Sequence, residues 1–293
     1  MAEKPTTIKQ FFERFPTDDA CLEHVMRVRF GLEGKCPKCS RQTKYYRIAK
    51  RRAYECTWCG HHLYPCVGTP FEASRTKLQS WFFAMFLFCT TRNGVSAKEL
   101  QRALGITYKA AWRMGTVIRS YMGSVDGDSM LGGSGAIVEA DKAFIGGKDK
   151  RGQDDKSVVL GIVERDDEVI TRVIPNRHEE NVIPHIVQNV KQGTRIATDE
   201  AKAFGSISAH GFRHSTVNHS IKEYVRGDTH TNTIEGFWAV VKRTIKGTHI
   251  WVSPKYLPLY LREIEYRFNL RRSPSVMFDL LVQAFGSSPR RVG

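Results

Sequence analysis

Hydrophobic residues in the first half of the chain recur at helical spacing, whereas those of the second half form strands that alternate with helices. The first region predicts three helices, at Leu78–Thr90, Ala97–Leu104 and Tyr108–Met122. Its most apolar stretch, Trp81–Cys89, has about half of the roughly 20 residues that a membrane-spanning helix needs. We therefore expect a buried helix there and no membrane segment.

Residues 96–107 carry the signals of a helix-turn-helix motif. Ser96 and Glu99 have the spacing of a capping box, Gly105 suits the turn, and Thr107 suits the start of the next helix. An ordinary helical hairpin packed on a neighbouring domain would show the same apolar spacing. In a DNA-binding motif, the first turns of the recognition helix would present Tyr108, Lys109 and Arg113 to the major groove.

The Gly- and Ser-rich residues 123–135 predict a domain boundary. Beyond them we expect strands at 136–141, 157–164, 168–175, 195–199 and 215–220. Helices are expected at 178–191, from about 201, and at 232–245, 255–268 and 275–285. Strands alternating with helices predict an α/β domain with a mixed sheet, an order compatible with a ribonuclease H-like core.

Length and charge narrow the class of protein. A chain of 293 residues is long enough for a catalytic domain and one or two small modules. The excess of 45 Lys and Arg over 30 Asp and Glu, a net charge of +15, favours a polyanionic partner, of which nucleic acid is the foremost. The N-terminal residues lack the order of a signal peptide, so we expect a protein that is not exported and whose cysteines stay reduced.

Two CxxC pairs, separated by sixteen residues, match the spacing of a zinc ribbon. We expect one structural zinc ion, bound by Cys36, Cys39, Cys56 and Cys59. A redox dithiol is the alternative for such pairs, and Cys66 with His61 and His62 offers substitute ligands. Cys21 and Cys89 lie on helical patterns and are expected to be small buried residues. The basic, tyrosine-rich hairpin between the pairs suits either a phosphate backbone or a protein surface.

Three acidic residues follow the domain boundary in an order that suits metal-dependent chemistry. Asp141 and Asp199 each end a predicted strand, so adjacent strands would bring both carboxylates to one edge of the sheet. Glu235 would supply a third carboxylate, and Lys242, seven helical residues later, would lie on the same face. Such oxygen ligands suit two Mg²⁺ or Mn²⁺ ions. The basic stripe of this helix continues with Arg243 and Lys246.

Each acid also has a structural interpretation. Asp199 suits a helix N-cap, Glu235 a capping-box partner of Asn232, and Asp141 a solvated strand end. Glu139 and Asn232 are rival or auxiliary groups. The joint occurrence of all three acids with the spaced lysine, in a basic chain with a ribbon, favours catalysis.

These motifs resemble those of bacterial insertion-sequence transposases of the DDE superfamily with an N-terminal zinc ribbon (ISXO2-like). The similarity rests on CPKC, CTWC, EADKAFIGGK, ATDEAKAF and HTNTIEGFWAVVKRTIKGTH. It implies a helix and zinc ribbon at 1–70, a helix-turn-helix module at 71–125, and a ribonuclease H-like domain at 135–293. By match to the family pattern, the metal-binding triad would be Asp141, Asp199 and Glu235, with Lys242 as its basic residue. The family pattern usually reads Asp-Glu at the first acid, whereas Lys142 follows Asp141 here.

The resemblance implies an enzyme of the cytoplasm and nucleoid that cleaves DNA at terminal inverted repeats, joins the freed 3′ ends to target DNA, and self-associates on DNA. Two alternatives share parts of this sequence pattern. A DNA-binding regulator would use the ribbon and the helix-turn-helix with an inactive catalytic domain. A ribonuclease H-like nuclease would use the same carboxylates without strand transfer.

Overall fold

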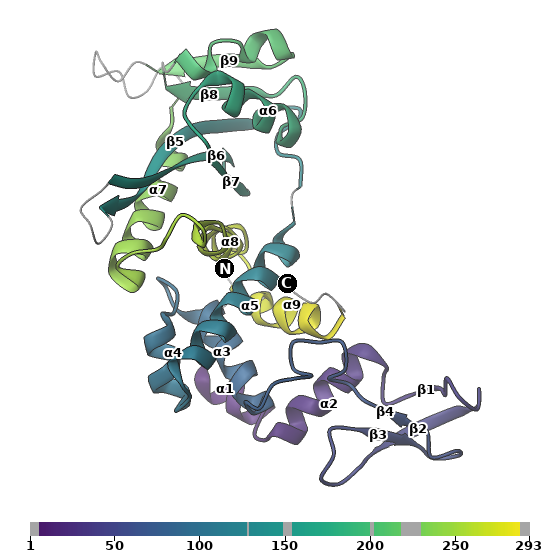
Figure 1. Cartoon of the computed structure of the whole chain (residues 1–293). Helices are drawn as coiled ribbons and strands as arrows, with labels where there is room; N and C mark the ends of the chain where they lie inside the picture. The colour runs from purple at the N-terminus through teal and green to yellow at the C-terminus, as the bar shows by residue number, and fades with distance from the viewer. Residues whose placement is uncertain (1–5, 128, 149–153, 200–201, 218–229, 288–293) are drawn as a thin grey trace. The chain divides into compact units, whose positions relative to one another are not determined.

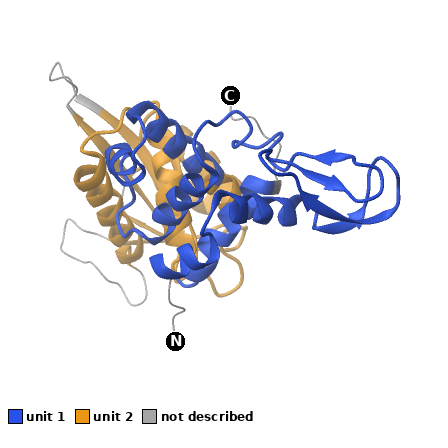
Figure 2. Cartoon of the chain, turned by 90° about the horizontal axis from the view of Figure 1, so that it is seen from below, with its two compact units in different colours: residues 1–121, 272–293 blue, residues 122–271 orange. Residues whose placement is uncertain are grey.

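The computed structural model describes residues 6–127, 129–148, 154–199, 202–217 and 230–287. The chain divides into two compact units, one of residues 1–121 and 272–293 and the other of residues 122–271 (Figure 2). The sequence-based boundaries group the last residues with the preceding sheet, whereas their contacts group them with the first unit.

The first unit combines a small sheet with helices from both ends of the chain (Figure 1). The sheet consists of β1 (Glu33–Lys35), β2 (Gln42–Arg47), β3 (Tyr54–Cys56) and β4 (His62–Leu63). The helices are α1 (Ile8–Arg14), α2 (Asp18–Arg29), α3 (Leu78–Thr90), α4 (Ala97–Leu104), α5 (Tyr108–Asp126), which continues into the second unit, and α9 (Pro274–Ser287).

The four strands form an antiparallel sheet in the order β1-β2-β3-β4. Residues of β2 alternate between exposed and buried, so Thr43 and Tyr45 face inward while Lys44 and Tyr46 face solvent. Pairing of β2 with β3 sets Tyr45 opposite Cys56 and thereby connects the two halves of the cysteine motif. The hairpin predicted between the two CxxC pairs is thus confirmed.

Aromatic side chains form the core of the helical part. Helix α3 has the predicted bounds, and eight of its residues are buried, as expected for an apolar helix within a protein. Its Phe82 and Phe86 lie within about 6.5 Å, ring centre to ring centre, of Phe278 of α9, which explains why the C-terminal helix belongs to this unit. Cys21 and Cys89 are buried, as predicted. Among the described residues, no helix has the length and hydrophobicity to cross a membrane.

The local signals around α4 and α5 are confirmed. Ser96 and Glu99 form both hydrogen bonds of the capping box, the Thr107 hydroxyl accepts from the Ala110 backbone N–H, and Gly105 adopts the left-handed conformation, with φ of 62°. The helical spacing of Leu100, Ala103 and Leu104 predicts that all three face inward. In the structure, Leu100 is buried, Leu104 is half-buried and Ala103 is exposed. The short α4 therefore buries a narrower face than its sequence suggests.

The second unit contains a five-stranded mixed sheet in the order β7-β6-β5-β8-β9. Its strands are β5 (Ile137–Lys148), β6 (Asp154–Glu164), β7 (Val169–Ile174), β8 (Arg195–Asp199) and β9 (Arg213–Val217). Helices α6 (Glu179–Asn189), α7 (Asn232–Thr244) and α8 (Leu257–Asn269) accompany them, with 3₁₀ helices η1 (Lys202–Phe204) and η2 (Ile207–His210) and a π-helix, Ile245–His249. Strands β5, β6 and β7 pair antiparallel, whereas β8 is parallel to both β5 and β9. The predicted mixed α/β architecture is confirmed.

Each face of this sheet carries its own apolar core. On one face, residues such as Val138 and Ala140 of β5 pack with Ile186 of α6 and with Phe204. On the other face, Ala143 of the same strand packs with α7 and α8, including Trp238. Neighbouring residues of a strand point to opposite faces. The even-numbered residues of β5 therefore face α6, and the odd-numbered residues face α7 and α8.

Three expectations for this unit need correction. Strand β5 does not end at Asp141, since it continues to Lys148 and pairs with β6 from Val138 to Lys148. Gly146 and Gly147 lie within this strand, where they pair with Lys156 and Asp155 of β6. The helix expected from about residue 201 consists, where described, of two 3₁₀ helices. The strand expected at 215–220 is shifted to Arg213–Val217, and residues 218–220 lie outside the described residues.

Candidate functional site

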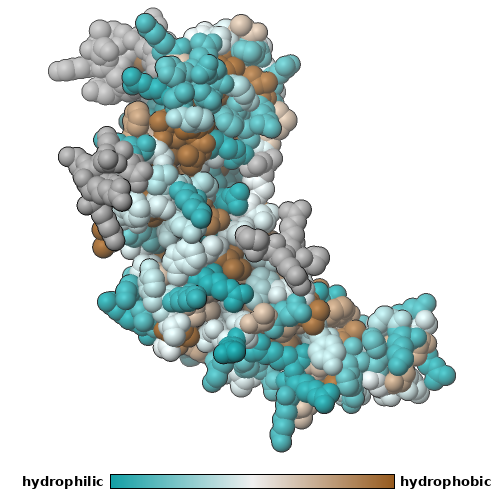
Figure 3. Space-filling view, in the orientation of Figure 1, coloured by the Kyte–Doolittle hydropathy of each residue, from teal (hydrophilic) through white to brown (hydrophobic). Residues whose placement is uncertain are grey.

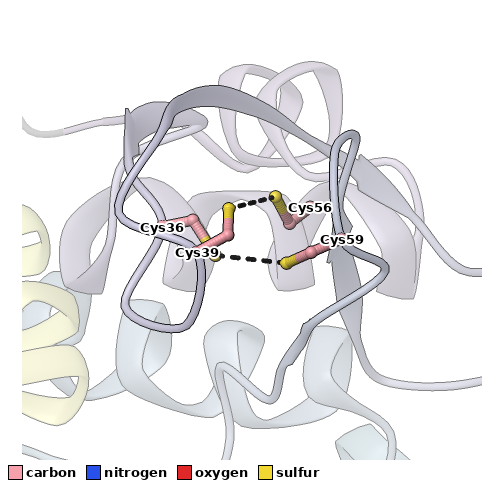
Figure 4. Close-up of side chains that lie close together, drawn as sticks. All are labelled: Cys36, Cys39, Cys56 and Cys59. Carbon is pink, nitrogen blue, oxygen red and sulfur yellow. Dashed lines mark hydrogen bonds between the residues drawn. The ribbon is translucent and has the colours of Figure 1, made fainter.

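The four cysteines of the two CxxC pairs converge on one point (Figure 4). Sγ of Cys36 lies 3.7 Å from Sγ of Cys59, and Sγ of Cys39 lies 3.8 Å from Sγ of Cys56. A tetrahedron with Zn–S distances of about 2.3 Å has S–S edges of about 3.8 Å, so this donor set fits a structural zinc ion. Among the described residues, these four form the group of metal-ligating side chains whose ligand atoms all lie within 4.8 Å of one another.

Hydrogen bonds favour the thiolate form of Cys56, which is the form that zinc binds. Burial tends to raise the pKa of Cys56, but a hydrogen bond with the Thr43 hydroxyl and backbone N–H donors from Cys59 and Trp58 outweigh it and lower that pKa to about 6. By contrast, burial raises the pKa of the Cys66 thiol to about 11. Cys66 lies outside the four-cysteine group, so the structure gives no support to its role as a substitute ligand.

Only part of the basic hairpin is available to a partner. Arg47 is held by the Asp19 carboxylate at 2.8 Å, and Tyr45 and Tyr54 are buried. Trp58 and Tyr46 are more than half exposed, and the Arg41 guanidinium lies 5.7 Å from the centre of the Trp58 ring. This cation–aromatic pair on a basic surface suits contact with nucleotides or with protein.

The residues expected at the start of a recognition helix are exposed on α5. Tyr108, Lys109 and Arg113 all face solvent, and the Lys98 ammonium of α4 lies 5.1 Å from the centre of the Tyr108 ring. Three of these four side chains are basic, so α4 and α5 present a positively charged surface that includes the Tyr108 ring.

Asp141 and Asp199 lie side by side on the sheet. The parallel pairing of β5 with β8 matches Ala140 with Thr198, so the next residue of each strand is an aspartate. Ala140 faces the α6 side, and by strand alternation both aspartates face the α7 side. The sequence-based expectation that adjacent strands bring these carboxylates together agrees with this register, although Asp141 lies within its strand and not at its end.

Trp238 of α7 fixes the position of Asp141. Its indole Nε1–H donates to Oδ2 of Asp141 at 3.1 Å. Gly161 of β6 is the cross-strand partner of Asp141, and a Cβ there would lie 2.6 Å from Cζ2 of Trp238. Glycine therefore leaves the space that the indole occupies beside the carboxylate.

Burial and like charge both act on this carboxylate. Burial raises the pKa of Asp141 above its ordinary value, and the nearby Asp199 raises it further, while hydrogen bonds from the Lys142 backbone N–H and from Trp238 oppose the shift. Burial also lowers the pKa of the Lys142 ammonium, which Asp199 and Asp141 oppose. A cation bound between the two aspartates would relieve their mutual repulsion.

Helix α7 presents the third acid and the basic residues. Glu235 lies one turn before Trp238, and Lys242 lies one turn after it. Both are exposed, and the Glu235 carboxylate accepts a hydrogen bond from the Thr231 hydroxyl at 3.0 Å. Arg243 and Lys246 are also exposed. In this structure, the carboxylates of Asp141, Asp199 and Glu235 are not gathered within 4.8 Å of one another.

Glu139 has a defined role that the sequence pattern left open. It is fully buried, and its carboxylate accepts from the backbone N–H groups of Thr233 and Ile234 at 2.9 and 3.0 Å, at the first turn of α7. Arg165 donates to the same carboxylate at 2.7 Å. Glu139 therefore binds the start of α7 to the strand that carries Asp141. Its position two residues before Asp141, on the same strand face, was the available signal.

Comparison with known proteins identifies relatives of both halves of the chain. Residues 16–62 match a transposase zinc-ribbon domain, and residues 130–269 match the ISXO2-like transposase domain. A Halobacterium salinarum protein described as an uncharacterized protein in transposable element ISH50 is 26% identical over 286 residues, covering 89% of this chain and 94% of that protein. An uncharacterized transposase-like protein of Haemophilus influenzae is 30% identical over 101 residues, covering 34% of this chain and 80% of that protein.

Proposed function

Because this chain belongs to the ISXO2-like transposases, we propose that it binds the terminal inverted repeats of its element, cleaves DNA there and transfers the freed 3′ ends to target DNA. The register of β5 and β8, which sets Asp141 beside Asp199, is the observation that carries this proposal. The proposal includes a ribonuclease H-like fold for the second unit. Three antiparallel strands followed by two parallel ones support that assignment.

The proposed catalytic residues are Asp141, Asp199, Glu235 and Lys242. Asp141 and Asp199 would hold Mg²⁺ or Mn²⁺ with Glu235, and the repulsion between two neighbouring carboxylates supports a cation there. Two such ions would activate the nucleophilic hydroxyl and stabilise the leaving oxygen of an in-line phosphoryl transfer. Trp238 would keep Asp141 oriented through its indole N–H, and Glu139 would hold α7, with Glu235, against the sheet.

The first unit is proposed to recognise DNA. Its zinc ribbon would contact the phosphate backbone, and α4 and α5 would act as a helix-turn-helix whose base-edge contacts come from Tyr108, Lys109 and Arg113. Arg243 and Lys246 of the second unit would add phosphate contacts near the carboxylates. The proposed working form is a set of protomers assembled on element ends, at the bacterial nucleoid.

The test is metal-dependent cleavage and end joining on a plasmid that carries the DNA flanking this coding region. We expect joined products from the wild type in Mg²⁺ or Mn²⁺, and a loss of about 10²-fold or more for Asp141→Asn, Asp199→Asn and Glu235→Gln. Asp166→Asn is the matched control. It removes an exposed carboxylate in the β6–β7 hairpin, beside the start of β5, where a positive φ of 63° also suits asparagine.

The outcomes separate the rival functions. Cleavage without joining would favour a nuclease, and DNA binding without metal-dependent cutting would favour a regulator. Activity that survives Glu235→Gln but not Asn232→Ala would assign the third ligand to Asn232. Equal activity of all variants would contradict the proposed site.

A further inference from the structure

An open cavity of about 560 Å³ lies beside the start of α6, and Lys142, the residue after Asp141, is part of its lining. Its lining residues are Lys142, Arg177, His178, Glu179, Lys202 and Ala203. We refer to it as the α6 pocket. Among the described residues that line it, three are cations and one is a carboxylate, so their charges together favour an anion. The surface over α6, β8 and β9 is mainly hydrophilic (Figure 3).

The topology explains why the cations meet there. Strands β5, β7 and β8 run in the same direction, so their carboxyl ends lie toward one edge of the sheet. Arg177 follows β7 and precedes α6, Lys202 follows β8 in η1, and Lys142 follows Asp141 within β5. Three separate segments therefore bring a cation toward the end of β8, where Asp199 lies beside Asp141 of β5.

Lys142 lies over an aromatic ring on the α6 side of the sheet. Its Nζ lies 3.9 Å from the centre of the Phe204 ring, whose side chain is fully buried in the core on the α6 side. By strand alternation, Lys142 faces the α6 side while Asp141 faces the α7 side. The residue after the first aspartate thus points its charge into the α6 pocket, on the side of the sheet opposite to Trp238.

We propose that the α6 pocket binds a phosphate of the DNA strand, next to the phosphate on which the carboxylates act. The inference rests on the proposed function for the location of the reacting phosphate. A strand that crosses this edge of the sheet meets the carboxylates on one side and Lys142, Arg177 and Lys202 on the other. The N-terminus of α6, an 11-residue helix, adds a favourable dipole, and the carboxylates of Glu179 and Glu180 in its first turn oppose it.

The test is a thermodynamic cycle in which a pocket side chain and a single DNA phosphate are changed separately and together, and the binding affinities are compared. A duplex with the element end is prepared with one phosphate at a time replaced by a neutral methylphosphonate, and Kd is measured without divalent metal for the full chain. In the wild type, we expect one position near the cleavage site to weaken binding by about three- to tenfold. In Lys202→Gln and Arg177→Gln, Kd for the unmodified duplex should rise by a similar factor, and the methylphosphonate at that position should have no further effect.

Lys191→Gln is the matched control. This exposed lysine follows the C-terminal end of α6, at the end of the helix away from the pocket, and its variant should keep the full methylphosphonate sensitivity. A parallel scan on an unrelated duplex reports whether target DNA uses the same pocket, and coupling on either duplex supports the inference. The inference would be overturned if the side-chain substitution and the methylphosphonate had additive effects on the binding free energy at every position of both duplexes. Because Kd is measured without cleavage, a chain that fails to cut DNA would contradict the proposed function and leave this result valid.

Discussion

At the scale of single residues, the position of Asp141 depends on two neighbours that carry no charge. Trp238 donates a hydrogen bond to its carboxylate, and Gly161, on the adjacent strand, provides the space for the indole. A charged residue within an apolar face needs such a fixed donor because its free energy depends on hydrogen-bond partners. The geometry of the candidate site therefore depends on Trp238 and Gly161 as well as on the acidic residues.

Gly161→Ala should disturb this arrangement. The added methyl group would lie 2.6 Å from Cζ2 of Trp238 and 2.8 Å from Cδ1 of Ile234, so the indole has to move away from Asp141. We expect a loss of about 1–3 kcal/mol in the free energy of unfolding, measured by urea denaturation, and a lower rate of metal-dependent cleavage. Gly147→Ala is the control, since a Cβ at Gly147 meets no atom within 4 Å among the described residues. Wild-type stability and cleavage in Gly161→Ala would contradict this account.

At the scale of elements, the ribbon and α7 are held by different means. The ribbon strands are short, from two to six residues, and its apolar core is small, so the cysteine cluster supplies much of its cohesion. Helix α7 instead packs on the sheet through buried residues such as Phe237 and Val241, and Glu139 binds its first turn. Metal binding thus stabilises one element and hydrophobic burial the other.

Cys36→Ser and Cys56→Ser should release zinc and unfold the ribbon. We expect the zinc content to fall from about one ion per chain to near none, measured by elemental analysis. Hydrogen exchange should show lost protection in β1–β4 and retained protection in β5–β8, because the second unit has its own cores. Cys66→Ala, a change at a buried cysteine outside the cluster, should keep its zinc. Full zinc content in both serine variants would refute the ribbon assignment.

At the scale of the whole molecule, positive charge is a property of both units, and it suits a polyanionic partner. A net charge of +15 at pH 7 gives long-range attraction to a polyanion, and exposed cations occur on the ribbon, on α5 and on α7. Such contacts release counterions from DNA, which makes the affinity depend on salt.

Binding of the wild type to the element end should therefore weaken steeply with salt. For about 6–10 phosphate contacts, we expect a loss on the order of 10³–10⁵ in affinity between about 50 and 200 mM salt, measured by fluorescence anisotropy. The same titration with Cys36→Ser reports the ribbon's share, because each lost phosphate contact lowers the slope by about one. An unchanged slope in that variant would assign the ribbon to protein contacts. A flat response in the wild type would contradict a DNA-binding surface.

Local signals in the sequence determined much of this protein. The two CxxC pairs predicted the four-cysteine cluster, because two short turns can bring four thiolates to one ion. The capping pattern at Ser96 and Glu99 and the apolar spacing of α3 predicted helix bounds, because those interactions lie within a few residues. The order of strands and helices predicted the mixed sheet.

Tertiary structure alone decided the features that depend on which segments meet. Strand β5 extends beyond Asp141 because β6 pairs with it, and Gly161 is small because Trp238, 77 positions away, lies against it. The first turn of α7 is bound by Glu139 of β5, and α9 packs with α3 in the first unit. No window of neighbouring residues contains these contacts, because they arise only when distant segments pack together.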